Sequence, residues 1–398
     1  MSSDPQPLWP AVTALGATQI IGWGTTFYAL GALSPDIAAD RAWPATLIFG
    51  AFSAALLLSG AISRKAGRAI DVHGGRRVMG SGSLLAAAGC AILGLATAEW
   101  IYVAGWLVLG VAMRFILYDA AFPSLAQIAG LRARRAISYL SLFGGLASTV
   151  FWPVSHYLAE AIGWRGTFWV YAGLHLFICL PLHLLFLRGP PKPEQHADTS
   201  SDGLTALRPL IGRERVHAMA AFAAVVALNG LVFSAISAHI VPLFQGLGFA
   251  PAIAVTLAAL VGPCQVVSRI GDILLGHRIS VMQLGLIAVG LLPVALIVFI
   301  GGGFALTAGL FFAALYGMSN GLMTIAKGAV PLSLFGRQDY GLVIGTIVTP
   351  QLILNAVAPT LFVFILAGLG PEWSLGLCLI FGSLSLLAMI HLARLHPR

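Results

Sequence analysis

The chain has 398 residues, of which 59% are hydrophobic and only 9% are charged, and its mean hydropathy is +0.92. A soluble domain carries roughly a quarter of its residues charged, so this composition excludes a domain that faces water on all sides. We therefore expect the chain to lie in a lipid bilayer, and the net charge of +8 to reflect its orientation there.

Long apolar segments recur along the chain with short polar breaks between them. Each segment is long enough for a transmembrane helix, which needs about 20 residues. Lipid satisfies no exposed backbone groups, so helices are expected, and the polar alternation of a membrane β-barrel is absent. The sequence predicts an all-α membrane protein with twelve transmembrane helices, at 9–33, 45–66, 78–97, 101–126, 137–159, 167–187, 216–240, 252–275, 279–300, 304–326, 340–366 and 374–393.

The basic residues fix the expected orientation. With the N-terminus inside, 18 of the 22 Lys and Arg residues, Lys327 among them, fall on the cytoplasmic side. Only Arg41 and Arg165 fall outside, and Arg114 and Arg269 remain in the membrane. This bias follows the positive-inside rule and predicts a multi-pass protein of the inner membrane with both termini in the cytoplasm. It also explains the positive charge without a nucleic-acid partner.

The longest polar stretch divides the chain into two halves. Residues 188–215 (RGPPKPEQHADTSSDGLTALRPLIGRER) are rich in Pro, Ser and charge, as cytoplasmic linkers are. The sequence thus predicts an N-terminal six-helix bundle at 1–187 and a C-terminal six-helix bundle at 216–398, arranged around a central cavity.

A short motif occurs at equivalent places in the two halves. GRAIDVHGGRR at 67–77 follows the second predicted helix, and SRIGD with GHR at 268–278 closes the eighth. The first stretch resembles the signature loop of the major facilitator superfamily, and the resemblance covers the whole chain. It implies secondary transport by alternating access. It also implies gating roles for the loop residues. In the family, the acid caps the end of a neighbouring helix, and the basic residues stabilise the cytoplasmic gate. The gating residues expected here are Asp71, Arg76, Arg77 and, from the repeat in the second half, Asp272.

A second stretch is similar to one branch of that superfamily. Residues 262–269 (GPCQVVSR) resemble the eighth helix of the monocarboxylate transporters and oxalate/formate exchangers, where an arginine binds the substrate carboxylate. Arg269 takes that position here. Several members of the branch carry an acid one helical turn earlier as proton carrier, whereas this chain has Gln265, so its proton coupling does not follow that relay.

Arg269 has two interpretations. It either lies at the cytoplasmic edge, as Arg68 does, or lies inside the membrane because Ile273, Leu274 and Leu275 continue the helix. Hydropathy favours the second, which places it roughly 9 Å deep. There its planar guanidinium either binds an anionic substrate or pairs with Asp272, three residues on and on the same helix face.

Arg114 and Asp119 are the deepest charged residues of the first half. On a continuous helix the five residues between them turn by about 140°, so they are not expected to share a face, whereas Tyr118 shares one with Arg114. Arg114 and Tyr118 therefore form a candidate anion site, and Asp119 is the first candidate for proton coupling. Buried ion pairs across helices are the alternative.

Other polar residues complete the candidate site. Amides and hydroxyls in transmembrane helices bind ligands or join helices, and a histidine carries protons near neutral pH. The remaining substrate-binding candidates are Tyr28, Gln19, Asn229, Asn320 and Asn355, and the second proton-coupling candidate is His239.

These patterns predict a transporter and not an enzyme or a channel. No nucleotide-binding loop, metal-ligand spacing, catalytic constellation or pore-lining ring of charge is present in the sequence, so no cofactor is expected. The partners expected are a small-molecule substrate, a coupling ion such as a proton, and lipid, with a monomeric chain. The favoured substrate is a small organic anion. The alternatives are efflux of a toxic compound, drug or metalloid, and uptake of a larger nutrient such as a vitamin.

Overall fold

The computed structural model describes residues 8–187 and 209–396, which fold almost entirely into helices. Most of the predicted linker, 188–208, lies outside the described residues. The first half contains α1 (Leu8–Gly22), a π-helical turn η1 (Trp23–Phe27), α2 (Ala29–Arg41), α3 (Ala45–Gly94), α4 (Glu99–Ile116), α5 (Tyr118–Ala129), η2 (Gly130–Arg132), α6 (Ala133–Gly145), α7 (Ala147–Leu174), a second π-helical turn η3 (His175–Cys179) and α8 (Leu180–Phe186). The second contains α9 (Gly212–Gly246), α10 (Pro251–Leu275), η4 (Gly276–Arg278), α11 (Val281–Gly301), α12 (Leu306–Phe335), α13 (Tyr340–Leu369) and α14 (Pro371–Leu395).

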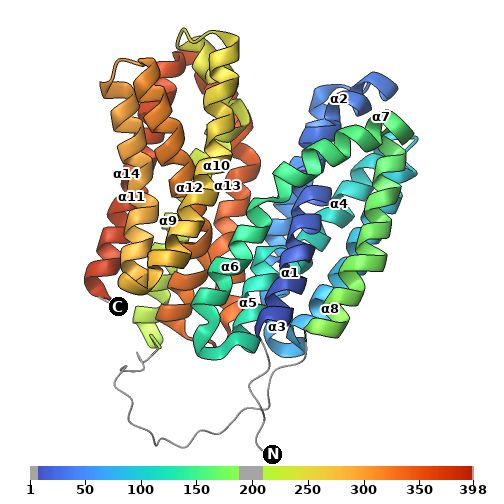
Figure 1. The fold of residues 1–398 in the computed structure, drawn as a ribbon, viewed down its shortest axis with the longest axis horizontal. Coiled ribbons are helices and arrows are strands. Elements are labelled where there is room, and N and C mark those ends of the chain that lie inside the picture. The colour runs from blue at the N-terminus through green and yellow to red at the C-terminus, as the bar shows by residue number, and fades with distance from the viewer. Residues whose placement is uncertain (1–7, 188–208, 397–398) are drawn as a thin grey trace, which may run out of the picture.

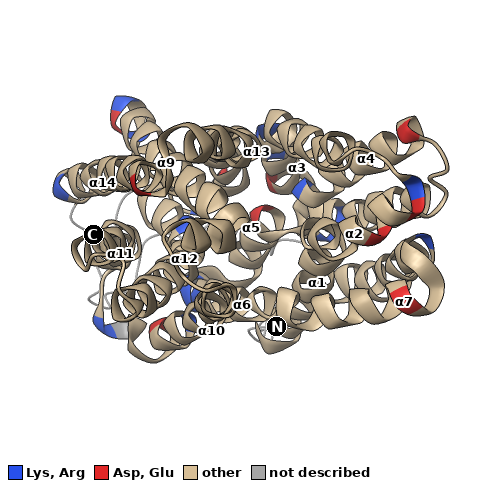
Figure 2. Cartoon of the chain, turned by 90° about the horizontal axis from the view of Figure 1, so that it is seen from above, with Lys and Arg blue, Asp and Glu red and all other residues tan. Residues whose placement is uncertain are grey.

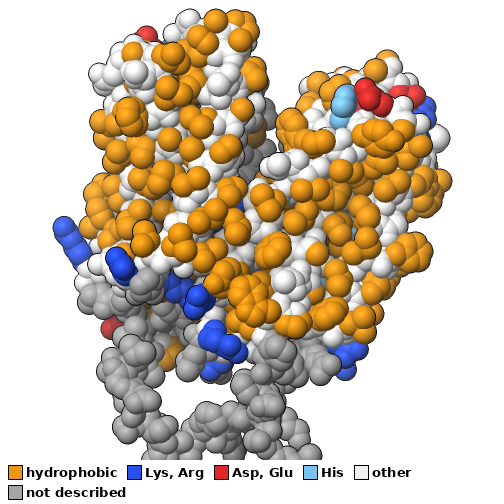
Figure 3. All heavy atoms as spheres, in the orientation of Figure 1, with side chains coloured by type: hydrophobic (Ala, Val, Ile, Leu, Met, Phe, Trp, Pro, Cys, Tyr) orange, Lys and Arg blue, Asp and Glu red, His pale blue; other side chains and the backbone are white. Residues whose placement is uncertain are grey.

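The helices form two groups that lie side by side (Figures 1 and 2). Helices α1–α8 make the first group and α9–α14 the second, with α5, α6, α12 and α13 near the centre. The start of α1 and the end of α14 lie at the same end of the molecule, here called the terminal end. The two groups are joined at the terminal end and diverge toward the opposite end, where Figure 3 shows them as separate masses.

Nine helical stretches among the described residues are long and apolar enough to cross a membrane. Two of them, Ala45–Gly94 and Ala133–Phe186, hold two spans each, because a glycine at positive φ breaks the helix near the middle. The stretch from α1 to α2 supplies one more span, divided by η1. The twelve-helix, two-bundle fold predicted from the sequence is thereby confirmed.

The two breaks depend on glycine. Gly74 has φ 77° and Gly163 has φ 73°, a region that side chains with a Cβ rarely adopt. The helices run up to both glycines, so the loop predicted between 66 and 78 is reduced to a break at Gly74. Asp71 therefore lies in the last helical turns before Gly74, and Arg76 and Arg77 lie in the first turn after it.

Each group has its own apolar core. In the first, Trp106 and Phe168 are fully buried, with ring centroids 6.3 Å apart. In the second, Phe299 and Phe312 stack at 5.0 Å, and Phe312 stacks on Tyr316 at 5.4 Å. Buried aromatic rings each remove about 150–250 Å² from solvent and dominate such cores. A further cluster of buried residues joins the two groups, because Tyr340, Ile344, Val348 and Leu352 of α13 pack with residues of α5 and α6.

The loops at the opposite end of the first group are fixed by a charged contact. The Asp40 carboxylate accepts hydrogen bonds from Trp164 Nε1 at 3.1 Å and Arg165 Nη1 at 2.9 Å. Hydrogen bonding from Trp164, supported by Arg165, holds the pKa of Asp40 below its usual value. This contact ties the end of α2 to the turn at Gly163.

The two groups approach most closely where α3 meets α13. Gly67 and Gly341 pack backbone to backbone, and a Cβ on Gly67 would collide with the carbonyl of Gly341. Gly345 faces the backbone of Ser63 in the same way. Small residues are needed wherever two helices approach this closely.

We expect Gly67→Ala to push the two groups apart at the terminal end. Overpacking at a tight contact costs about 1–3 kcal/mol, enough to move a population between two conformations. Spin labels at the exposed residues His73 and Gln338 would show a longer distance in the variant. Gly50→Ala, in the same helix with open space around it, is the matched control. Identical distance distributions in the two variants would contradict the prediction.

Candidate functional site

A cavity of about 400 Å³ lies between the two groups. Residues of α6 and α7 and Tyr28 form its wall on the first group, and residues of α10 form its wall on the second. The lining combines small and apolar residues with hydroxyl and amide side chains: Tyr28, Gly145, Ser148, Thr149, Gly262, Pro263, Gln265, Val266 and Val267.

Arg269 lies beside this cavity. It follows Gln265 by one turn of α10, and its side chain is only 4% exposed. Its Nη1 lies against the lining residue Gly145, where any Cβ would collide with it. Its Nη2 donates to Thr324 Oγ1 over 3.4 Å, whereas Nε and Nη1 have no partner among the described residues. Helix α10 continues through Ile273 and Leu274 to Leu275, as the second of the two interpretations requires.

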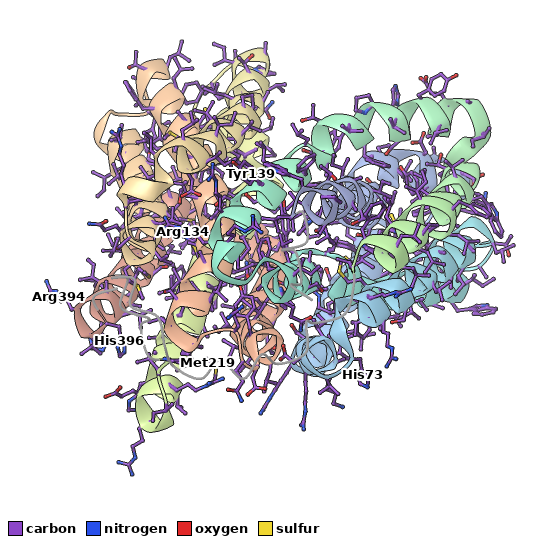
Figure 4. All side chains as sticks on the ribbon, turned by 60° about the horizontal axis from the view of Figure 1, so that its bottom comes forward. His73, Arg134, Tyr139, Met219, Arg394 and His396 are labelled. Carbon is purple, nitrogen blue, oxygen red and sulfur yellow. The ribbon has the colours of Figure 1, made fainter. Side chains whose placement is uncertain are left out.

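Arg269 does not pair with Asp272, so that alternative was wrong. The carboxylate of Asp272 instead accepts a hydrogen bond of 2.6 Å from Ser138 and lies 3.9 Å from Arg134. Both partners belong to α6, in the other group, and Figure 4 shows Arg134 on α6 at the boundary between the groups. The spacing of three residues on one helix allowed Arg269 to pair with Asp272. The Asp272 carboxylate instead contacts Ser138 and Arg134 of α6.

Arg114 and Asp119 form a buried ion pair, contrary to the expectation from a continuous helix. The helix breaks at Leu117, whose ψ of −172° is extended and separates α4 from α5. The break turns Asp119 toward Arg114. It also leaves the carbonyl of Ile116 without its helical donor, and Gln19 Nε2 replaces that donor at 2.7 Å.

Lys327 is a site residue that the sequence analysis missed. It was counted as a cytoplasmic charge, but α12 continues to Phe335 and carries Lys327 into the interior, where its side chain is 15% exposed. Its Nζ lies 3.2 Å from Asp119 Oδ1, so Asp119 joins the two groups. The apolar run that follows, from Ala329 to Phe335, is the signal that could have placed it in the helix.

Tyr118 and Tyr28 both belong to the first group, and their ring centroids lie 5.3 Å and 6.3 Å from that of Trp23. The Tyr118 hydroxyl donates to the carbonyl of Ser141 at 2.9 Å, and its ring stacks on Phe122. A Cβ on Gly144 would meet that hydroxyl, so the glycine makes room for Tyr118. Tyr28 lines the cavity at the end of η1. The structure therefore brings Arg269, Tyr118 and Tyr28 to the same interface.

Three further residues predicted to bind substrate lie away from the cavity lining. Gln19 is fully buried, and its side-chain nitrogen donates a hydrogen bond to the carbonyl of Ile116. Asn229, 1% exposed, has no partner for its amide among the described residues. The side-chain amide nitrogen of Asn355, in the orientation that gives both amide atoms suitable partners, donates to the carbonyls of Gly230 at 2.9 Å and Gln351 at 3.2 Å. None of the three lines the cavity.

Asn320 and His239 also lie away from the cavity lining. Asn320 accepts from Thr324 through its backbone carbonyl. His239 stands where α9 departs from helical geometry, with Nδ1 3.2 Å from the carbonyl of Ala235 and its ring 5.8 Å from Phe362. The structure does not bring His239 to Asp119.

The acid of the signature motif joins the groups at the terminal end. Asp71 accepts hydrogen bonds from the backbone N–H groups of Gly341 at 2.8 Å and Leu342 at 2.7 Å, in the first turn of α13. A carboxylate is favourable at a helix N-terminus, where N–H groups lack helical partners. Arg76 and Arg77 are exposed and make no ion pair within the described part of the chain.

The central interface carries an excess of positive charge. Asp119 is the one carboxylate shared by Arg114 and Lys327, and Arg269 stands beside them without an acidic partner among the described residues. Buried charges are costly and attract ligands of opposite sign. The described residues hold no group of three or more His, Cys, Asp or Glu that could bind a metal ion. The arrangement favours an anion.

Two bundles of transmembrane helices joined at one end, with a cavity and buried charges between them, define a membrane transport protein. The chain belongs to the Major Facilitator Superfamily, whose sequence profile matches residues 14–326.

Solved structures share this fold. The human organic anion transporter MFSD10 (TETRAN) superposes with a TM-score of 0.75 over 97% of this chain and 99% of its own, at 16% sequence identity. The proton:xylose symporter XylE, bound to 6-bromo-6-deoxy-D-glucose, superposes with a TM-score of 0.71 over 97% and 95%, at 15% identity. Both likenesses concern the fold. No curated protein matches the sequence.

Proposed function

We propose that this protein is a secondary carrier of a small organic anion, of the monocarboxylate kind, which works by alternating access. The observation that carries the proposal is Arg269, a buried guanidinium beside the inter-bundle cavity with two nitrogen atoms unpartnered among the described residues. Arg114 and Lys327 share the single carboxylate of Asp119, which leaves the interface with an excess of positive charge, and Tyr28 offers the cavity a hydroxyl.

The physical argument rests on what a buried guanidinium requires. A charge without a partner is costly in a medium of low polarity, and a bound carboxylate would satisfy it. The planar fork of arginine matches the two carboxylate oxygens, and the group stays charged at any physiological pH. A neutral or cationic substrate, whether a toxic compound, a drug, a metalloid or a larger nutrient, would leave this charge unsatisfied.

We infer the remaining parts of the cycle from the contacts between the groups. Asp71 and Asp272 hold the terminal end closed and would release it when the cavity opens there. Asp119 is the candidate for proton coupling, because its contact with Lys327 must break in the same motion. Basic side chains gather near the terminal end in Figure 3, which supports placing that end in the cytoplasm.

Purified protein in liposomes should exchange organic anions across the membrane. We expect radiolabelled monocarboxylate to enter vesicles preloaded with the same unlabelled anion, with rates that saturate as the outside concentration rises. Protein-free liposomes are the control. Flux that rises linearly without saturation would indicate a channel, and saturable exchange of neutral solutes alone would overturn the anion proposal.

A further inference from the structure

The cavity next to Arg269 has four polar side chains in its walls. Tyr28, Ser148 and Thr149 contribute hydroxyls, and Gln265 contributes an amide. Each of these groups both donates and accepts hydrogen bonds. None of the four side chains is hydrogen-bonded to another described residue, so all four are available to a ligand.

These side chains surround the cavity and are not confined to one wall. Tyr28 follows η1, Ser148 and Thr149 belong to the first turn of α7, and Gln265 lies on α10 of the other group. A molecule in the cavity would therefore meet hydroxyl or amide groups on both sides. The apolar part of the lining, Gly262, Pro263, Val266 and Val267, belongs to α10.

Only one cation near the cavity is free of an acidic partner within the described residues. Arg114 and Lys327 share Asp119, whereas Arg269 has no carboxylate partner. A second carboxylate on the ligand would find no free cation to pair with. The charge of the site therefore matches a single carboxylate.

The cavity is large for the smallest organic acids. Its volume of about 400 Å³ falls among pockets of about 300–1,000 Å³ that hold drug-sized ligands. A small acid on Arg269 would leave most of this space, and most of the four polar groups, to water. A ligand of sugar size carries enough hydroxyls to pair with polar groups on both walls.

We propose that the substrate is a hydroxylated monocarboxylate of sugar size, that is, a sugar acid. Its carboxylate binds Arg269, and its hydroxyls bind Tyr28, Ser148, Thr149 and Gln265. This inference rests on the proposed function and narrows it to a chemical class. An unsubstituted aliphatic acid of the same length would leave the polar walls unpaired, and sites built for a hydroxyl discriminate strongly against analogues that lack it.

Three probes test the class with the full chain in liposomes. D-Gluconate has the carboxylate and the hydroxyls, hexanoate has only the carboxylate, and D-glucose has only hydroxyls. We expect gluconate to inhibit anion exchange at least tenfold more strongly than either of the others. Equal inhibition by hexanoate would overturn the sugar-acid inference and leave the anion carrier standing. Equal inhibition by glucose, with no anion required, would overturn both.

Two variants locate the recognition in the cavity. We expect Gln265→Leu and Ser148→Ala to weaken gluconate binding about fivefold or more, a loss within the range for one hydrogen bond, and to leave hexanoate binding unchanged. Thr256→Val is the matched control, because Thr256 is on the same helix and its hydroxyl bonds only to the carbonyl of Ala252. Equal loss for both probes in Gln265→Leu, or no loss for gluconate in either variant, would overturn the assignment.

Discussion

Asp119→Asn is expected to destabilise the protein by about 3–5 kcal/mol, the cost of removing one partner from a buried ion pair. The substitution leaves both Arg114 and Lys327 without a carboxylate among the described residues, and their side chains are 4% and 15% exposed. Asparagine keeps the size of the side chain, so packing changes little. The loss should appear as a fall of several degrees in the melting temperature of the purified protein.

Two further variants separate the contributions of the two cations. Lys327→Gln removes the contact between groups but keeps the Arg114–Asp119 pair, so we expect a smaller loss of stability than in Asp119→Asn. Glu160→Gln is the control for removal of a carboxylate, because Glu160 lies on the surface with its side chain 67% exposed. If Asp119→Asn melted at the temperature of Glu160→Gln, the buried contacts of Asp119 with Arg114 and Lys327 would not stabilise the protein.

The sequence predicted the number and type of helices well, because hydropathy over some 20 residues is a strong signal in lipid. It failed at Leu117, where neither Pro nor Gly marks the break between α4 and α5. The break is supported by Gln19, which lies almost a hundred residues away in sequence. Local periodicity contains no information about such a partner, so the sequence predicted that Arg114 and Asp119 point to different faces and gave buried ion pairs only as the alternative.

The same limit applies to the contacts between the groups. Helical spacing suggested Asp272 for Arg269, but Ser138 and Arg134 from α6 take that carboxylate. Ser148 and Thr149 gave no signal, because single hydroxyls in transmembrane helices are common and more often bond to their own helix. What the sequence does show is the rare buried charge, and Arg269 and Asp119 were both found by that criterion.

Arg269 is expected to be the most sensitive position for transport. Arg269→Ala should reduce anion exchange by about 100-fold, the equivalent of roughly 3 kcal/mol for a lost charge-assisted contact. Arg269→Lys should be impaired nearly as much, because an ammonium keeps the charge but loses the planar fork that fits two carboxylate oxygens. Exchange at fixed protein amount in liposomes, with folding checked by melting temperature, measures both.

The double variant Arg269→Ala with Asp272→Ala decides between binding and structure. If Arg269 served only to neutralise Asp272, removing both would restore transport. Asp272 already has Ser138 at 2.6 Å and Arg134 at 3.9 Å, and Arg269 has Thr324 and two nitrogen atoms with no described partner. We therefore expect the double variant to stay inactive toward anions, and Asp272→Ala alone to weaken closure of the terminal end without removing anion binding. Recovered anion exchange in the double variant would show that Arg269 is not a substrate ligand.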